Sequence, residues 1–417
     1  MTTALVWVPI TDPRLDLRGA AWSEPVDGGL RPHRLPAWCR DRMPDGFARL
    51  CDEQAAGVRV RLRTAARQVV LRASTTQQVV EGSGRPAAGV WDLVVDGVPA
   101  GSVAVVTTGT DLLEPASGAV VRAPGDPVEV RFVVPGPPAE RDLEIWLPYG
   151  EQVVLHELGA DAPVLAATAV HLPRWVHHGS SISQGANAAS PTGTWPVVAA
   201  RSAGLDLVNL GMSGNAVLDP YVARAIAQAD AELVTLKVGI NVVNRDCLRE
   251  RTFVPALHGF LDTLRQGLPR TPVVVISPLL CPLVEATPGP TSLDPATGRF
   301  RTEADGVHRA EGQLDLRRIR DLVAGVVASR AGWDPMLHHL DGRELWGPGD
   351  EAQTPFGDAM HPDPPAHVTI GQRFAGLLDA QGWLGDPRLA TTPGDTSMDT
   401  SAEILKLAGG GGARVDR

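Results

Sequence analysis

Short stretches of alternating apolar and polar residues fill the first part of the chain, up to about residue 165. The stretch 57–63 reads GVRVRLR and the stretch 68–73 reads QVVLRA. A period of two puts the apolar side chains on one face, which is typical of a half-buried β-strand. Turns that contain Gly or Pro separate the stretches, and this spacing predicts an all-β, jelly-roll-like sandwich. Further strands are predicted at 90–97, 101–107, 127–134 and 142–147.

Residues 10–50 are rich in Arg, Pro and Gly and show no clear period. Because they offer no strand or helix pattern, we expect them to wrap around the predicted sandwich. The sequence thus predicts an N-terminal accessory domain over residues 1–165.

From about residue 166 the pattern changes to short apolar runs that alternate with longer helical stretches. Alternating strands and helices predict βαβ units, a parallel sheet and helices on both of its faces. We therefore expect an α/β catalytic domain over 166–390, followed by a polar, Gly-rich tail at 391–417 that is largely disordered. Strands are predicted at 173–178, 206–210, 233–238, 272–277 and 336–340, and helices at 194–203, 219–229, 253–267, 304–330 and 364–382.

Charge and composition narrow the function classes. The net charge of −10 argues against a nucleic-acid or anionic membrane partner, which would require a positive field. The N-terminus lacks a basic secretion-signal region, and no apolar run approaches the roughly 20 residues needed to cross a bilayer, so a cytoplasmic location is expected. The four cysteines lie far apart and predict reduced thiols, with no metal or cofactor motif. The sequence does not determine the oligomeric state.

Four segments rich in chemically useful residues follow predicted strands or lie late in the chain. They read GSSIS at 179–183, GMSGN at 211–215, GIN at 239–241 and DAMH at 358–361. Sites in open parallel sheets form at the carboxyl ends of the strands, so these segments are expected to meet. A serine needs a base to take its proton, and a carboxylate three residues before a histidine can orient that base. The segments therefore favour acyl transfer.

These motifs resemble those of the SGNH (GDSL-type) hydrolase superfamily over roughly residues 172–385. The resemblance implies a flavodoxin-like three-layer α/β/α fold and hydrolysis of esters, thioesters or acylated sugars. It implies that Ser181 is the nucleophile and that Asp358 and His361 complete the triad. The backbone N–H groups of Ser181 and Gly214 and the side-chain amide of Asn241 would form the oxyanion hole. A preceding β-sandwich is similar to the arrangement in some carbohydrate esterases of this superfamily.

Two positions depart from the family pattern. The usual GDS reads Gly179-Ser180-Ser181 here, which makes Ser180 a rival nucleophile, although Ser181 aligns with the family serine. The usual GxND ends in Val242 instead of Asp. That Asp is not a triad member, so its loss removes no catalytic role.

Other candidates have structural interpretations. His177 and His178 are expected to point to opposite faces of a strand, and Asp363 and His367 are expected on a helix surface. The segment 281–302 is the longest irregular stretch of this half, and it either shapes the substrate pocket or is a plain surface loop.

We therefore expect a serine esterase acting on a small-molecule or carbohydrate-like acyl ester. The alternatives are an acyltransferase that uses the same machinery and a catalytically silent binding protein.

Overall fold

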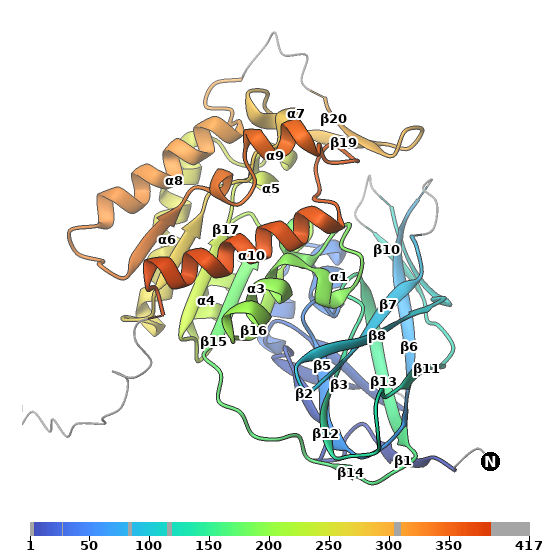
Figure 1. The fold of residues 1–417 in the computed structure, drawn as a ribbon. Coiled ribbons are helices and arrows are strands. Elements are labelled where there is room, and N and C mark those ends of the chain that lie inside the picture. The colour runs from blue at the N-terminus through green and yellow to red at the C-terminus, as the bar shows by residue number, and fades with distance from the viewer. Residues whose placement is uncertain (1–3, 27, 82–85, 115–118, 304–309, 385–417) are drawn as a thin grey trace, which may run out of the picture.

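The computed structural model describes residues 4–26, 28–81, 86–114, 119–303 and 310–384. The predicted tail at 391–417 lies outside the described residues. Two antiparallel sheets come first in the chain and a parallel sheet with helices on both faces follows (Figure 1). The predicted fold class, an α/β domain preceded by a β-sandwich, is confirmed.

The two antiparallel sheets enclose an apolar core of Val, Leu, Ile and Trp side chains, which come from alternate positions of both sheets. All the strands predicted here are present, and several more were missed because they are short or lack alternation. One sheet contains β1 (Val6–Pro9), β3 (Trp22–Val26), β4 (Gly29–His33), β6 (Gln68–Val80), β9 (Gly109–Leu113), β10 (Val120–Ala123), β11 (Val128–Val133) and β13 (Glu151–Ala160). The other contains β2 (Asp16–Arg18), β5 (Arg59–Thr64), β7 (Gly89–Val95), β8 (Val98–Val105), β12 (Arg141–Trp146) and β14 (Val164–Leu165).

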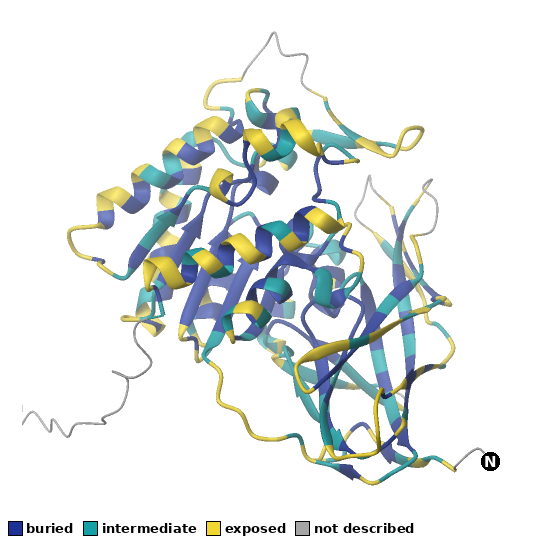
Figure 2. Ribbon diagram, viewed as in Figure 1, coloured by how far each residue is buried: buried dark blue, intermediate teal, exposed yellow. Residues whose placement is uncertain are grey.

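The parallel sheet has the strand order β16-β15-β17-β18-β21, which is the flavodoxin-like order 2-1-3-4-5. It is buried on both faces, as Figure 2 shows in dark blue. Its strands are β15 (Arg174–Gly179), β16 (Asp206–Gly211), β17 (Leu233–Lys237), β18 (Val273–Ile276) and β21 (Leu337–Leu340).

Helices cover both faces of this sheet, which completes the three layers (Figure 1). One face packs against α3 (Trp195–Ala203) and α10 (Pro364–Gln381), and the other against α4 (Pro220–Ala227), α6 (Glu250–Gly267) and α8 (Leu316–Arg330). Of the helix predicted over 304–330, residues 304–309 lie outside the described residues, and α8 begins at Leu316 because the Asp315 side chain accepts a hydrogen bond from the N–H of Arg318 and caps it there. Among the described helices, none is both long and apolar enough to span a bilayer.

Residues 10–50 do not simply wrap the sandwich, so that prediction was wrong. They form strands β2 to β4 and begin α1 (Gly46–Glu53). Leu35, Cys39 and Ala48 pack into the same core as the parallel sheet and helices α4 and α6. Residues 10–50 show no single period because some of them form strands of the sandwich while others pack against the α/β part. The predicted boundary at 165/166 falls between β14 and β15, but the division into domains remains a prediction.

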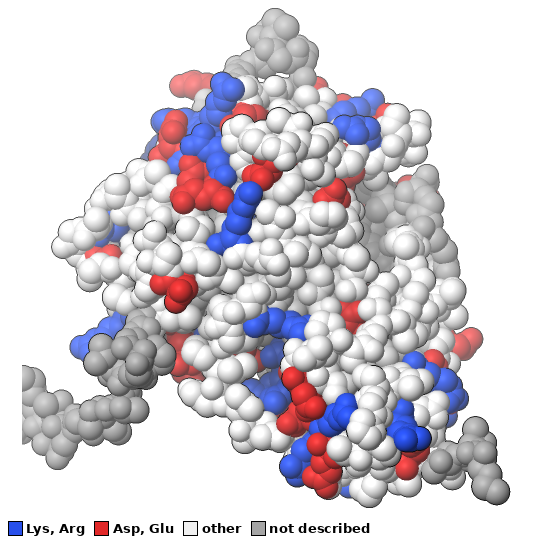
Figure 3. All heavy atoms as spheres, viewed as in Figure 1, with Lys and Arg blue, Asp and Glu red and all other residues white. Residues whose placement is uncertain are grey.

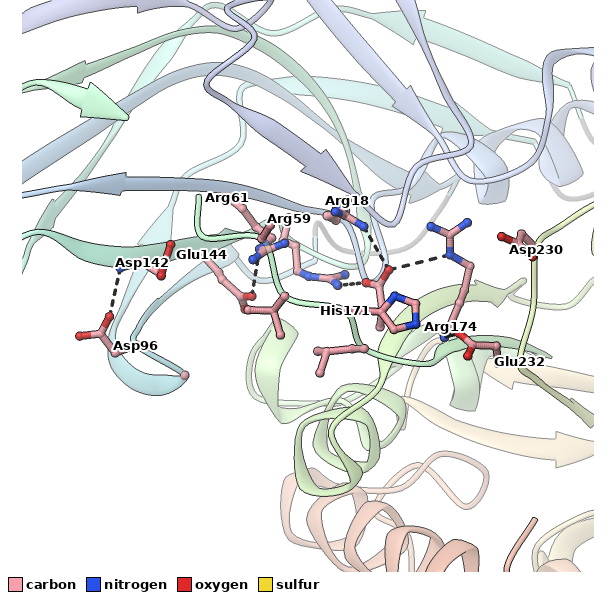
Figure 4. Close-up of a pocket in the computed structure, with 15 residues that line it drawn as sticks. Arg18, Arg59, Arg61, Asp96, Asp142, Glu144, His171, Arg174, Asp230 and Glu232 are labelled. Carbon is pink, nitrogen blue, oxygen red and sulfur yellow. Dashed lines mark hydrogen bonds and ion pairs between the residues drawn. The ribbon is translucent and has the colours of Figure 1, made fainter. Parts of the chain in front are cut away.

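A cluster of ion pairs joins the two halves at the amino ends of the parallel strands. Asp206, the first residue of β16, binds the guanidinium of Arg59 and lies 3.4 Å from Arg18 and 3.9 Å from Arg174 (Figure 4). Arg18 and Arg59 come from the sandwich. The cluster of ion pairs around Asp206 therefore fastens the sandwich to the sheet at the end opposite the carboxyl strand ends.

Elsewhere on the face seen in Figure 3, acidic and basic side chains are interspersed, with no broad area of one sign.

Two glycines allow a short helix to lie directly on the strand ends. A Cβ on Gly211 would stand 2.3 Å from the backbone N of Gln184, and one on Gly179 would stand 2.2 Å from the Ser183 Oγ. Both contacts fall in α2 (Ser181–Gln184), so its position requires the absence of side chains below it.

The substitution Gly211→Ala should lower the free energy of unfolding by about 1–3 kcal/mol, because the added methyl overpacks against the α2 backbone. Urea unfolding would measure this. As a control, Gly325→Ala places a methyl in open space on α8 and should raise stability by up to about 1 kcal/mol. Equal effects of the two substitutions would contradict the packing argument.

Candidate active site

Ser181 and His361 meet although 180 residues separate them. The Ser181 Oγ lies 2.8 Å from the His361 Nε2, within hydrogen-bond reach. The other ring nitrogen, Nδ1, lies 2.7 Å from the Asp358 Oδ2. Since a carboxylate accepts, Nδ1 carries the proton and Nε2 is free to accept the serine proton. An imidazole held in this tautomer can act as a general base towards Ser181.

The turn 358–361 holds Asp358 in a fixed orientation. Its Oδ1 accepts hydrogen bonds from the backbone N–H groups of Met360 at 2.8 Å and His361 at 2.7 Å. Ala359, which lies between Asp358 and Met360, has a φ of +69°, a conformation rare for residues with a side chain. The Asn187 side chain donates a further bond to Oδ2 at 3.0 Å.

Burial raises the pKa of Asp358, but the hydrogen bonds and charge of His361 and the two backbone donors outweigh it and lower the pKa to about 2. Asp358 is therefore ionised at neutral pH.

Ser180, the rival serine, is fully buried and caps α2. Its Oγ accepts a hydrogen bond from the backbone N–H of Ile182 at 3.3 Å. Ser181, unlike Ser180, lines the cavity. The geometry thus favours Ser181 over Ser180.

Three potential donors belong to residues that line the same cavity. Ser181, Gly214 and Asn241 line one cavity with His361. The Asn241 Oδ1 accepts a bond from the Ala216 N–H at 3.1 Å, which fixes the amide. Among the described residues, no acceptor is found for the Asn241 Nδ2 or for the backbone N–H groups of Ser181 and Gly214. Such free donors can stabilise an oxyanion.

The polar layer beneath α2 anchors the nucleophile helix. His177 lies on one face of β15, with its Nε2 2.8 Å from the Ser183 Oγ and its Nδ1 2.6 Å from the Thr235 Oγ1. Burial lowers the pKa of His177 well below its usual value, so the ring is neutral. His178 points to the opposite face and stacks on Phe260. The prediction of opposite faces is confirmed, and neither histidine reaches the cavity.

His367 is fully buried, so its prediction as a surface residue was wrong. The face of α10 that carries it packs against α3: the Trp195 N–H donates to its Nδ1 at 3.2 Å, and its Nε2 donates to the Ala186 carbonyl at 2.8 Å. Burial lowers the pKa of His367 to about 4. Asp363 is half-buried and caps α10.

The segment 281–302 is less irregular than predicted and reaches the cavity. It contains α7 (Pro282–Glu285) and a hairpin of β19 (Thr291–Asp294) and β20 (Arg299–Thr302). Phe300 lines the cavity, packs edge-on against the His361 ring at 5.3 Å and donates its N–H to the Asp358 carbonyl at 2.8 Å. Of the two interpretations, the geometry favours a wall of the pocket.

Sequence reasoning missed the part of the cavity wall that comes from the N-terminal half. Phe47, Gln54, Gln78 and Tyr149 line a cavity of about 470 Å³ together with the residues above. Gln54 also accepts a hydrogen bond from the Gln184 side chain of α2. No local pattern marks these residues, because their role depends on how the sandwich docks. Among the described residues, no three His, Cys, Asp or Glu side chains gather as metal ligands would.

Comparisons with known proteins bear on the family and the fold. Residues 174–280 match the model of the GDSL-like lipase/acylhydrolase family. A salicylyl-acyltransferase, SsfX3, from a tetracycline biosynthetic pathway is 27% identical, with a TM-score of 0.76 over 92% of this chain and 99% of the other. The family match and the shared fold together support the SGNH/GDSL hydrolase superfamily for this chain.

Other solved structures are similar to this chain in fold. A protein described as a GDSL-like lipase from Bacteroides ovatus ATCC 8483 is 22% identical, with a TM-score of 0.65 over 90% of this chain and 98% of the other. A family two carbohydrate esterase from Clostridium thermocellum, solved with cellohexaose, is 14% identical, with a TM-score of 0.54 over 79% and 94%. No curated protein is significantly similar in sequence. These neighbours thus share the fold of this chain.

The low pKa of Asp358 has a consequence for stability. Because the folded-state pKa lies below the ordinary value of 3.8, the ionised carboxylate stabilises the fold above about pH 4, and this contribution is lost as the pH falls towards 2. Wild type should exceed Asp358→Asn in free energy of unfolding by about 1–2 kcal/mol at neutral pH, allowing for solvent screening. Urea unfolding at a series of pH values should show the difference shrinking below about pH 4. A difference independent of pH would contradict this assignment.

Proposed function

We propose that the chain is a serine esterase that forms an acyl-enzyme on Ser181. The observation that carries the proposal is the chain of short contacts from Ser181 through His361 to Asp358, of which Ser181 and His361 line the cavity. The Ser181 Oγ attacks the ester carbonyl while its proton passes to the His361 Nε2. Asp358 stays ionised and stabilises the imidazolium. The bond to the alcohol then breaks, and the alcohol leaves with the proton held by His361.

Water completes the cycle. It attacks the acyl carbon, gives a proton to His361 and releases the carboxylic acid as the proton returns to Ser181. In both steps the carbonyl oxygen becomes negative. The N–H groups of Ser181 and Gly214 and the amide of Asn241 are the proposed donors to it, and losing one such donor typically costs about 10²–10³ in rate.

The cavity suits an ester with an apolar portion, because Phe47, Phe300, Met360 and Tyr149 contribute to its walls. A sugar-like alcohol is a candidate for the other portion, since a structural neighbour is a carbohydrate esterase solved with cellohexaose.

The substitution Ser181→Ala should reduce hydrolysis of an activated aryl ester by at least about 10³-fold and abolish labelling by a fluorophosphonate probe, because no nucleophile remains. Ser180→Ala is the matched control: it removes a buried cap, costs about 1 kcal/mol of stability and should leave labelling intact. Unlabelled, folded wild type would favour a catalytically silent binding protein. Labelling that survives in Ser181→Ala would place the nucleophile elsewhere.

Acyl transfer is the second candidate function, favoured by the 27% identity to a salicylyl-acyltransferase over nearly the whole chain. The acyl-enzyme is common to both reactions, and only the acceptor differs. If water is the acceptor, adding aliphatic, phenolic or sugar alcohols should leave free acid as the main product of an activated ester. Chromatographic product analysis would measure the ratio. A dominant new ester at millimolar acceptor would instead establish a transferase.

A further inference from the structure

The cavity around Ser181 is lined by a positively charged side chain and by no negatively charged one among the described residues. Among the described residues that line it, Arg245 is the one permanently charged side chain, and no Asp or Glu takes part. The chain as a whole carries a net charge of −10, so a cationic, carboxylate-free cavity is contrary to the overall balance. Most of the remaining wall is apolar or carries neutral amides and hydroxyls.

Arg245 is held in place by neutral partners. It is the last residue of α5 (Ile240–Arg245), one helical turn after Asn241. Its Nη1 donates to the Gly214 carbonyl and to the Asn215 Oδ1, both at 3.1 Å. These two bonds fix the guanidinium beside the oxyanion-hole loop and leave its other N–H groups without a bond to any described residue.

No carboxylate pairs directly with this guanidinium. Among the described residues, none lies within ion-pair distance of Arg245, whereas Arg249, four residues later, forms a two-pronged pair with Asp246 at 2.6 and 3.0 Å. Asp219 acts on Arg245 at longer range; burial raises the pKa of Asp219 to about 6, so this carboxylate is still mostly ionised at neutral pH and offsets part of the positive charge. Arg245 therefore keeps N–H groups that no ion pair with a described residue occupies and that can bind an anionic ligand.

The charge lies close to the reacting centre. The Arg245 Nη1 is 3.1 Å from the Gly214 carbonyl oxygen, which places it within about 7 Å of the Gly214 backbone nitrogen. A substrate whose carbonyl oxygen sits in the proposed oxyanion hole thus brings neighbouring groups within reach of the guanidinium. Arginine presents paired N–H donors that match the two oxygens of a carboxylate.

We infer that Arg245 selects esters that carry a carboxylate a few bonds from the scissile carbonyl. This inference deepens the proposed esterase function and rests on it. The substrate class is then an acidic ester with an apolar body: the anion binds the guanidinium and the body packs against Phe47 and Phe300. Because a bond between charged partners is stronger than one between neutral groups, we expect a preference of roughly ten- to a hundredfold over the neutral analogue.

Matched pairs of esters test the inference. One pair is the 4-nitrophenyl monoester of glutaric acid and its methyl-capped, neutral counterpart. The other places the carboxylate on the leaving alcohol, as 4-(butanoyloxy)benzoate and its methyl ester. Wild type should show the higher kcat/KM for the acidic member of at least one pair, and high salt should reduce the preference. The pair that responds identifies the half of the substrate that faces Arg245.

Variants separate charge recognition from support of the loop. Arg245→Gln should remove the preference, Arg245→Glu should reverse it, and Arg245→Lys should keep much of it. Arg251→Gln makes the same change of net charge on the exposed start of α6 and should leave the preference unchanged. Equal preference in wild type and Arg245→Gln, or an equal loss of kcat/KM for acidic and neutral esters, would overturn the inference.

The failure of the proposed function would look different. In that case wild type would hydrolyse neither member of either pair, while binding would still report on Arg245. Titration calorimetry with the Ser181→Ala protein measures this directly, because that variant keeps Arg245. Tighter binding of the acidic member, lost in Ser181→Ala/Arg245→Gln, would support the inference, and equal affinities would overturn it.

Discussion

The close approach of α2 to the strand ends is the constraint on which the site depends. Gly179 and Gly211 end neighbouring parallel strands, and their missing side chains let the α2 backbone lie directly above them. Ser181 begins that helix, so its hydroxyl and its N–H stand at the sheet edge where the loop carrying Gly214 and the first turn of α5 with Asn241 also lie. Hydrogen bonds to Ser183 from below hold the helix there. The chemistry therefore depends on the position of α2 above the strand ends more than on any single reactive group.

The N-terminal half is built into the site rather than attached to it. Arg34 is almost fully buried and donates to the carbonyls of Asn209 at 3.0 Å and Gly211 at 2.6 Å, at the end of β16. Gln54 then contacts α2 through Gln184. These bonds satisfy buried backbone groups of the α/β part with side chains from the β part. We therefore expect the shape of the cavity to depend on both halves folding together.

The hairpin β19–β20 closes the opposite side of the cavity and also steadies the base. Phe300 packs on the imidazole of His361 and binds the backbone of Asp358. The positive φ of Ala359 is tolerated because Asp358 accepts the two following N–H groups. The β19–β20 hairpin thus both holds His361 in position and forms a wall of the proposed pocket. Because of this double role, we expect contacts between substrate and hairpin to affect the geometry of the triad.

The sequence alone determined the parallel sheet, the order of its elements and the residues proposed for the chemistry. Apolar runs, glycine turns and the DxxH spacing are local signals, and the carboxyl ends of parallel strands must share an edge. Only the tertiary structure decided that Ser180 is a buried cap, that His367 is internal and that Phe47, Gln54 and Arg245 face the cavity. Local periodicity reports which face of an element is buried, but not what buries it. That depends on how separate parts of the chain dock, through contacts between residues far apart in sequence.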